Sequence, residues 1–99
     1  MKKFKLNGKE YEAKEFDFNL ICDLEDMGIS LDAAAEKTMN LIRAYISFCI
    51  GKGKEHAGKE IQEHLVKGGT FDEIMVLMSE MMDKSDFFRA ITQKAETAD

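Results

Sequence analysis

Histidine is the residue type most often used as a metal ligand or proton carrier, and this chain has two histidines. His56 and His64 lie eight residues apart in a stretch whose composition predicts one helix. That spacing separates them by about 12 Å along a helix axis, too far for both to bind one metal ion. Neither lies in a His-Glu-x-x-His pattern. The spacing therefore indicates surface or half-buried helical histidines, and we expect no metal site and no cofactor.

The two cysteines are the next candidates, either as nucleophiles or as a disulfide. Cys22 and Cys49 lie in apolar stretches and form no Cys-x-x-Cys pair. A nucleophilic Cys49 would need polar, electropositive surroundings to become a thiolate, whereas its neighbours are Phe48 and Ile50. We therefore expect two small core side chains in a reducing compartment rather than a catalytic thiol or a disulfide.

Residues 51–54, Gly-Lys-Gly-Lys, are the segment most similar to a phosphate-binding loop. They lack the preceding strand and the full spacing of a P-loop, and no Gly-x-Ser-x-Gly or Gly-x-Gly-x-x-Gly pattern occurs. Adjacent carboxylates such as Glu25 and Asp26 carry little information in a chain with 19 acidic residues. No pattern points to catalysis, so we expect a protein that is not an enzyme.

The charge balance and the hydrophobic pattern further limit the classes of partner that the chain can bind. The formal net charge is -5, from 14 basic and 19 acidic residues, so the chain does not attract a phosphate backbone at long range. No apolar run reaches the roughly 18 residues that a membrane span needs. The basic start at residues 1–5 is not followed by the apolar segment of a signal peptide. We expect no nucleic-acid partner, no membrane partner and a cytoplasmic setting.

Methionine is the residue type that stands out. Four of the seven methionines fall between Met75 and Met82, with phenylalanines on either side of them. Methionine is unbranched and polarizable, so a Met-rich face can repack against varied partners. A stripe at helical spacing is also typical of a core, and we expect a mixture in which part of the stripe meets a partner helix. The candidate partner-binding residues are Phe71, Met75, Met78, Met81, Met82, Phe87 and Phe88.

The elements that must position these residues begin with a β-hairpin. Asn7-Gly8 tolerates the two positive φ values of a type I′ turn between two short alternating segments. A lone hairpin is marginal in water, so its apolar residues Phe4, Leu6 and Tyr11 are expected to pack on helices. The register set by the turn gives the cross-strand pairs Phe4–Tyr11, Lys5–Glu10 and Lys3–Glu12.

Apolar spacing and capping residues predict helices over the rest of the chain. Asp17 is the expected N-cap of the first helix, and Gly28 the left-handed residue after it. Residues 39–50 are almost wholly apolar and predict a central helix, whose polar strip is Asn40, Arg43 and Ser47. Thr70-Phe71-Asp72-Glu73 matches a capping box, with the Glu73 side chain reaching back. The expected helical segments are 18–27, 31–37 leading into 39–50, 55–67, 70–82 and 86–91.

These elements fit one domain over residues 1–99. The expected fold class is mainly α (α+β), an N-terminal β-hairpin packed on a bundle of about five helices. The hairpin occupies residues 1–14 and the helical part 17–93. The polar residues 94–99 are expected to form a frayed tail.

The order of these patterns resembles the tail assembly chaperones of long-tailed phages and prophages of Gram-positive bacteria. The resemblance covers nearly the whole chain and lies in FKLNGKEY at 4–11, FDFNLICDLEDMGI at 16–29, LIRAYISF at 41–48 and SDFFR at 85–89. It implies a non-catalytic protein that keeps the tape measure protein soluble and helps tail tube protein assemble around it. It also implies a location in the host bacterial cytoplasm and absence from the mature virion.

A tape measure protein is a long helical chain with repeated apolar faces, so its holdase needs an adaptable apolar surface on an acidic body. Several copies could coat one client, and a homo-oligomer is therefore compatible with this function. The alternative is a small helical adaptor or regulatory module that binds a single folded partner.

Overall fold

The chain begins with a hairpin and continues as four helices in the part described by the computed structural model, residues 2–29, 38–87 and 89–90. The elements are β1 (Lys3–Leu6), β2 (Lys9–Glu12), α1 (Phe18–Asp26), α2 (Thr38–Ile50), α3 (Lys54–Val66) and α4 (Phe71–Lys84). The mainly helical fold with an N-terminal hairpin is confirmed, but these ranges hold four helices rather than about five. The expected helical segment 31–37 and the tail 94–99 lie outside the described residues.

Helix α4 ends at Ser85, in the gap between the predicted segments 70–82 and 86–91, because the backbone there leaves helical geometry. Ser85 ends α4 with φ −81° and ψ 115°, an extended conformation. Beyond it, residues 86–87 and 89–90 are helical, and the Arg89 N–H donates to the Ser85 carbonyl at 3.0 Å. The predicted segment 86–91 is thus helical at the residues that the structure describes, 86–87 and 89–90.

The hairpin has the predicted register. Phe4 pairs with Tyr11, with Lys5 opposite Glu10 and Lys3 opposite Glu12. Asn7 and Gly8 have φ values of 53° and 78°, as a type I′ turn requires. The apolar face packs on the helices as expected: Leu6 is fully buried, and Phe4 and Tyr11 are half-buried against the core.

Local capping chemistry sets the ends of α1. The Asp17 carboxylate accepts a hydrogen bond from the Leu20 N–H at 2.9 Å, which confirms it as the N-cap. Gly28 has φ 83°, and the Ile29 N–H donates to the Leu24 carbonyl at 3.0 Å. This bond, together with buried Ile29, makes a Schellman end that directs the chain back toward the core.

Helix α2 is central, as its composition predicts, since it contacts α1, α3 and β2. Its predicted polar strip is only partly right. Asn40 is exposed and its Oδ1 accepts a hydrogen bond from the half-buried Arg43, whereas Ser47 is buried. The Ser47 hydroxyl donates to the Ala44 carbonyl one turn back, at 2.7 Å. A serine that satisfies its hydroxyl within its own helix can enter a core at low cost.

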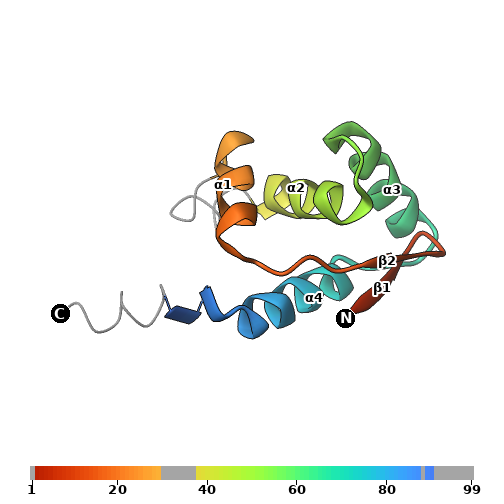
Figure 1. Cartoon of the computed structure of the whole chain (residues 1–99). Helices are drawn as coiled ribbons and strands as arrows, with labels where there is room; N and C mark the ends of the chain where they lie inside the picture. Colours follow the sequence, from red (N-terminus) through yellow and green to blue (C-terminus); the bar gives the residue numbers. More distant parts are fainter. Residues whose placement is uncertain (1, 30–37, 88, 91–99) are drawn as a thin grey trace.

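Residues 13–17, between the hairpin and α1, form an extended segment that we name the strap. Figure 1 shows it running between α4 on one side and the layer of α1 and α2 on the other. Phe16 is buried, and its ring stacks on that of Tyr45 from α2, with centroids 4.9 Å apart. The Tyr45 hydroxyl donates to the Lys14 carbonyl, and the Ser85 hydroxyl donates to the Phe16 carbonyl, each at 2.6 Å. The strap thus joins α2 to the end of α4.

The elements form two layers, which Figure 1 shows in side view. Helices α1, α2 and α3 make one layer, and α4 with the hairpin makes the other. One hydrophobic cluster lies between them; its buried residues come from every element except β2, whose half-buried Tyr11 packs against it. Its fully buried members, at under 2% exposure, include Tyr45, Phe16, Leu6, Ile42 and Ile46.

We expect Gly8→Ala to lower the free energy of unfolding by about 1–2 kcal/mol, because an L-residue with φ near 78° brings its Cβ against the following carbonyl oxygen. Crowding is not the reason, since no heavy atom lies within 4 Å of the added Cβ. Gly58→Ala is the matched control. Gly58 lies inside α3 and its added Cβ would make an ordinary 3.5 Å contact with Arg43, so stability should rise by about 0.5–1 kcal/mol. Urea denaturation measures both, and an unchanged Gly8→Ala protein would contradict the turn.

Tyr45→Phe should lower the free energy of unfolding by about 1–3 kcal/mol, because it removes the donor to the strap carbonyl of Lys14 and leaves the aromatic stacking intact. Tyr11→Phe is the control, since the half-buried Tyr11 makes no hydroxyl hydrogen bond within the described ranges. Its effect should stay below about 0.5 kcal/mol. Equal effects of the two substitutions in thermal denaturation would show that the strap bond contributes nothing.

Candidate functional site

The methionine-rich segment forms α4, and its predicted partner-binding residues divide between the core and the surface. The Thr70 hydroxyl caps the helix by accepting the Glu73 N–H at 3.3 Å. Met78 and Met81 point inward and are only 5% and 6% exposed. With Ile74 they make the core-facing stripe of the helix. In the isolated chain these two methionines pack into the core.

The other predicted residues are more accessible. Phe71, Met82 and Phe87 are half-buried against the core, and Phe88 lies outside the described residues. The Phe87 ring also meets the exposed Phe18 ring edge to face, with centroids 5.5 Å apart. Met75 is 46% exposed. The methionines of α4 therefore divide between buried and exposed positions. Among the predicted partner-binding residues, Met75 is the most exposed methionine.

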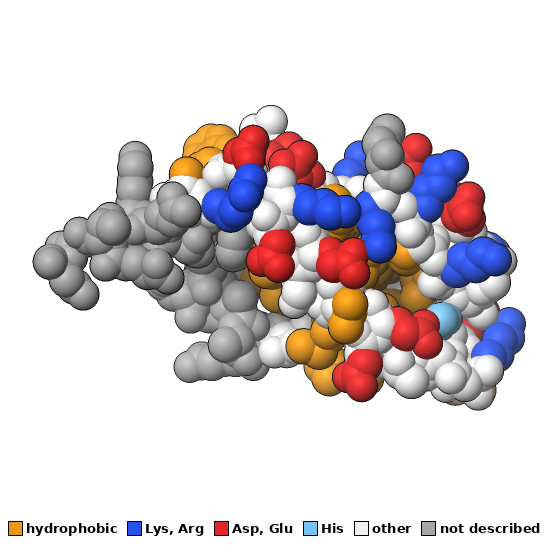
Figure 2. Space-filling view, turned by 90° about the horizontal axis from the view of Figure 1, so that it is seen from below, with side chains coloured by type: hydrophobic (Ala, Val, Ile, Leu, Met, Phe, Trp, Pro, Cys, Tyr) orange, Lys and Arg blue, Asp and Glu red, His pale blue; other side chains and the backbone are white. Residues whose placement is uncertain are grey.

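Val76, which the sequence analysis did not select, is 57% exposed beside Met75. Its position off the methionine stripe is the signal that could have identified it, because an apolar residue on the outer face of a helix does not serve the core. Figure 2 shows the side of the molecule that carries α4 and the hairpin, where hydrophobic side chains reach the surface among acidic ones. Met75 and Val76 form an adjacent pair of exposed apolar side chains on that helix.

Next to Met75 the surface is hollowed between α2 and α4. This α2–α4 hollow has a volume of about 180 Å³. Its walls are mainly apolar and come from both helices, so sequence spacing within α4 alone did not reveal it. The lining residues are Thr38, Leu41, Ile42, Met75, Met78, Ser79 and Met82. Three of the predicted partner-binding residues thus meet at one small apolar depression.

A second group of side chains ties the hairpin tip to α3. The Asn7 amide donates to Glu63 Oε2 at 2.6 Å and to Glu60 Oε2 at 3.3 Å. Lys9 Nζ donates to Glu60 Oε1 at 3.0 Å. Because the Glu60 side chain is only 8% exposed, these donors take the place of water around its charge. We name the set Asn7, Lys9, Glu60, Glu63, His64 and Glu73 the clasp.

His64 extends the clasp from the hairpin to α4. The backbone N–H of Asn7 donates to His64 Nδ1 at 3.0 Å, so Nδ1 carries no proton and Nε2 carries it. Nε2 then donates to Glu73 Oε2 at 3.1 Å. His64 is therefore a half-buried structural histidine that connects three elements, which agrees with the sequence interpretation of its burial.

The capping box at the start of α4 is only half formed. Thr70 caps as predicted, but the Glu73 carboxylate bonds to His64 instead of reaching back to the Thr70 N–H. The turn before α4 is shaped around the same ring. A Cβ added to Gly69 would fall 2.2 Å from His64 Nε2, so only glycine fits there without displacing the histidine. Glu73 therefore bonds to His64 of α3, whereas the local spacing predicted that it would cap the start of its own helix.

In the clasp, the Glu60 carboxylate and the Lys9 ammonium each stabilise the charged form of the other. The hydrogen bond from Lys9 lowers the pKa of the Glu60 carboxyl below its ordinary value of 4.5, and Glu60 in turn raises the pKa of Lys9 above 10.5. Elsewhere, burial raises the pKa of the Cys49 thiol and so disfavours its thiolate. Both cysteines are free and half-buried, rather than the core residues expected.

Apart from Asn7 Oδ1, which is buried without a hydrogen-bond partner in the described part of the chain, the polar side chains of the clasp bond to one another. The clasp is therefore a structural connection between elements. In the ranges 2–29, 38–87 and 89–90, no three His, Cys, Asp or Glu side chains gather closely enough to hold a metal ion. None of the helices described here is long and apolar enough to cross a bilayer. Comparison with protein-family models, with curated proteins and with solved structures gives no match for this chain. The apolar surface of α4 and the α2–α4 hollow are the candidate functional site.

The clasp predicts a specific pH dependence of stability. Since the pKa of Glu60 is lower in the folded state, its contribution is complete above pH 4.5 and is lost as the pH falls through the folded-state pKa. Glu60→Gln should therefore destabilise the protein most near neutral pH and progressively less below pH 4.5. Chemical denaturation at several pH values measures this difference.

The same change in a Lys9→Met background supplies the control. Without the Lys9 ammonium, most of the pH dependence of the Glu60→Gln effect should disappear, because that hydrogen bond is the main cause of the lowered pKa. If the effect of Glu60→Gln were the same at every pH in both backgrounds, the ion pair would make no contribution to folding.

Proposed function

We propose that this chain is a non-catalytic tail assembly chaperone that binds the apolar face of a long helical client, the tape measure protein, and assists tail tube assembly. The observation that carries the proposal is the exposed Met75–Val76 pair beside the Met-lined α2–α4 hollow. Methionine side chains adapt to differently shaped apolar partners, which a client with many similar but unequal helical repeats requires. The family resemblance over nearly the whole chain supports the same function.

The charge and the rigid connections of the fold are consistent with this function. A net charge of -5 keeps an apolar binding surface from driving self-precipitation. The clasp and the strap hold both ends of α4 to the rest of the chain, through His64–Glu73 and through Ser85–Phe16. A client could therefore bind along α4 without detaching it. Tail tube protein and further copies of the chain are the other partners proposed, in the cytoplasm of a host bacterium and not in the mature virion.

The test is coexpression with a phage tape measure protein, with the soluble client fraction as readout. Wild type should raise that fraction, and the double variant Met75→Asp/Val76→Asp should lose most of the effect. Two charges on the exposed face would oppose apolar contact with the client. Circular dichroism should show the variant folded, since the two side chains are 46% and 57% exposed.

Two controls separate binding from folding. Val66→Asp makes the same kind of change at a residue of α3 that is 79% exposed, and should leave client solubility unchanged. Met78→Asp places a charge in the core and should unfold the protein. A folded Met75→Asp/Val76→Asp variant with full activity would contradict the α4 surface as the client site. A single stoichiometric complex without any gain in client solubility would favour an adaptor over a chaperone.

A further inference from the structure

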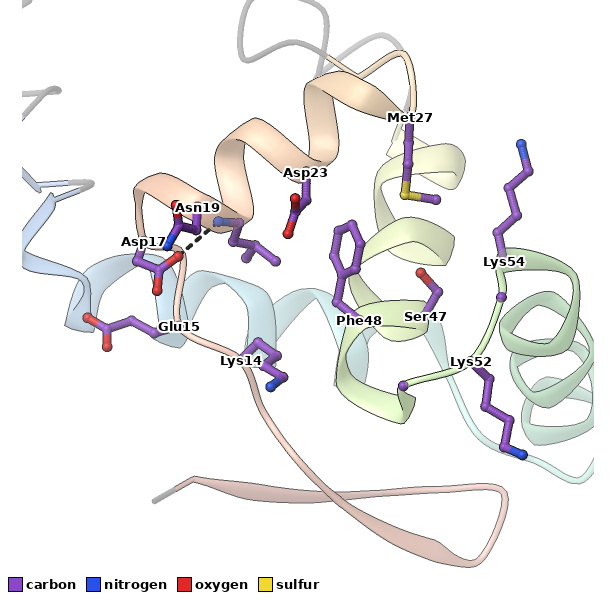
Figure 3. Close-up of a pocket in the computed structure, with 13 residues that line it drawn as sticks. Lys14, Glu15, Asp17, Asn19, Asp23, Met27, Ser47, Phe48, Lys52 and Lys54 are labelled. Carbon is purple, nitrogen blue, oxygen red and sulfur yellow. Dashed lines mark hydrogen bonds between the residues drawn. The ribbon is translucent and has the colours of Figure 1, made fainter.

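A groove lies between α1 and the end of α2, in a different place from the α2–α4 hollow. Its volume is about 650 Å³. Leu20 and Met27 of α1 and Phe48 of α2 supply its apolar floor. Figure 3 shows Phe48 and Met27 between the two helices. Leu20 is buried and the other two are half-buried, so the floor remains accessible to a partner side chain.

Two acidic and two basic side chains lie on opposite edges of this groove, and Lys14 and Glu15 of the strap also line it with charges of opposite sign. Asp17 and Asp23 lie on the α1 edge, whereas Lys52 and Lys54 lie across the groove on the connection to α3 and its first residue, as Figure 3 shows. All four side chains are exposed. Six ion pairs occur within the described residues, and none of them involves any of these four. Asp17 also caps α1 by accepting the Leu20 N–H, so Asp23, Lys52 and Lys54 are the charges most available to a partner.

We propose that this groove binds an amphipathic helix whose apolar stripe is flanked by basic residues on one side and acidic residues on the other. The apolar floor suits side chains spaced at i, i+3, i+4 and i+7 along a helix. The basic flank of that helix faces Asp17 and Asp23, and the acidic flank faces Lys52 and Lys54. This inference does not rest on the chaperone function, because the groove shares no lining residue with the α2–α4 hollow.

Charge complementarity also makes the binding directional. A helix that turns end over end in the groove keeps its apolar stripe on the floor but exchanges its two flanks. Exchanging the basic and acidic flanks of a bound helix therefore reverses its direction without abolishing binding. A helix with two basic or two acidic flanks meets one repulsive edge in either direction.

The experiment is a selection of displayed helical peptides on the immobilised full chain. The library keeps a leucine stripe at i, i+3, i+4 and i+7 and varies the flanking positions among Lys, Glu and Ser. The expected result is enrichment of peptides with Lys on one flank and Glu on the other, in both orders. Enrichment without flank preference, enrichment of flanks with one sign, or no enrichment at all would overturn the proposal.

Charge reversals in the chain then locate the binding of the best enriched peptide. Asp23→Lys and Lys52→Glu should each weaken it by about two- to fivefold, the range of partly exposed ion pairs. The double variant should not recover the affinity, because Asp17 and Lys54 keep their charges and each edge then carries one charge of either sign. A double variant with wild-type affinity would overturn the proposal. Asp83→Lys and Lys59→Glu make the same charge changes at exposed residues that do not line the groove, and should have no effect.

Two further readouts exclude other occupants and other sites. Amide chemical shifts on titration with the peptide should change at Asn19, Asp23 and Lys52, and changes confined to Met75 and Val76 would place the peptide on α4 and overturn the proposal. Sedimentation of the free chain should be the same for wild type and for the double reversal. A shift from dimer to monomer in the double reversal would show that a second copy covers the groove, and would overturn it as well.

Discussion

The fold depends on one constraint, which is that the irregular strap must satisfy its backbone carbonyls while it lies between two layers. A buried carbonyl without a donor costs about as much free energy as a lost hydrogen bond, and the strap has no neighbouring strand to supply one. Tyr45 and Ser85 supply donors at Lys14 and Phe16. Because these donors come from α2 and from the end of α4, satisfying the strap also holds together two helices that are far apart in the chain.

The strap positions the elements that precede and follow it in the sequence. Toward the C-terminus it delivers Asp17 to the start of α1, whose capping fixes one edge of the groove. Toward the N-terminus it joins the hairpin, whose tip the clasp holds against α3 and, through His64 and Glu73, against α4. Helix α4 is thus attached near its first turn by the clasp and at its end by the strap. Its outer face remains uncovered by any described residue, which is why Met75 and Val76 are exposed.

Sequence reasoning succeeded where a few neighbouring residues decide the outcome. Asn7-Gly8 accepts two positive φ values that other pairs resist, so the turn type and the hairpin register follow from those two residues. The caps at Asp17 and Thr70 follow from side chains that reach N–H groups three residues ahead. It failed to predict that Ser47 is buried, because the Ser47 hydroxyl bonds to the Ala44 carbonyl within its own helix. It also failed to predict the role of Glu73, because the Glu73 side chain bonds to His64 and not to the Thr70 N–H.

By itself, the sequence determined the hairpin, the N-caps of α1 and α4, the Gly28 end of α1 and the presence of a methionine-rich amphipathic helix, because these depend on local φ preferences, capping and periodicity. It could not show which methionines are buried, since Met75 and Met78 are chemically the same, and only the packing of α4 in the whole fold leaves one at the surface and the other in the core. The groove, the hollow and the strap likewise join residues from separate elements. Only the tertiary structure decided them, because burial and charge opposition are properties of surfaces that two or more elements make together.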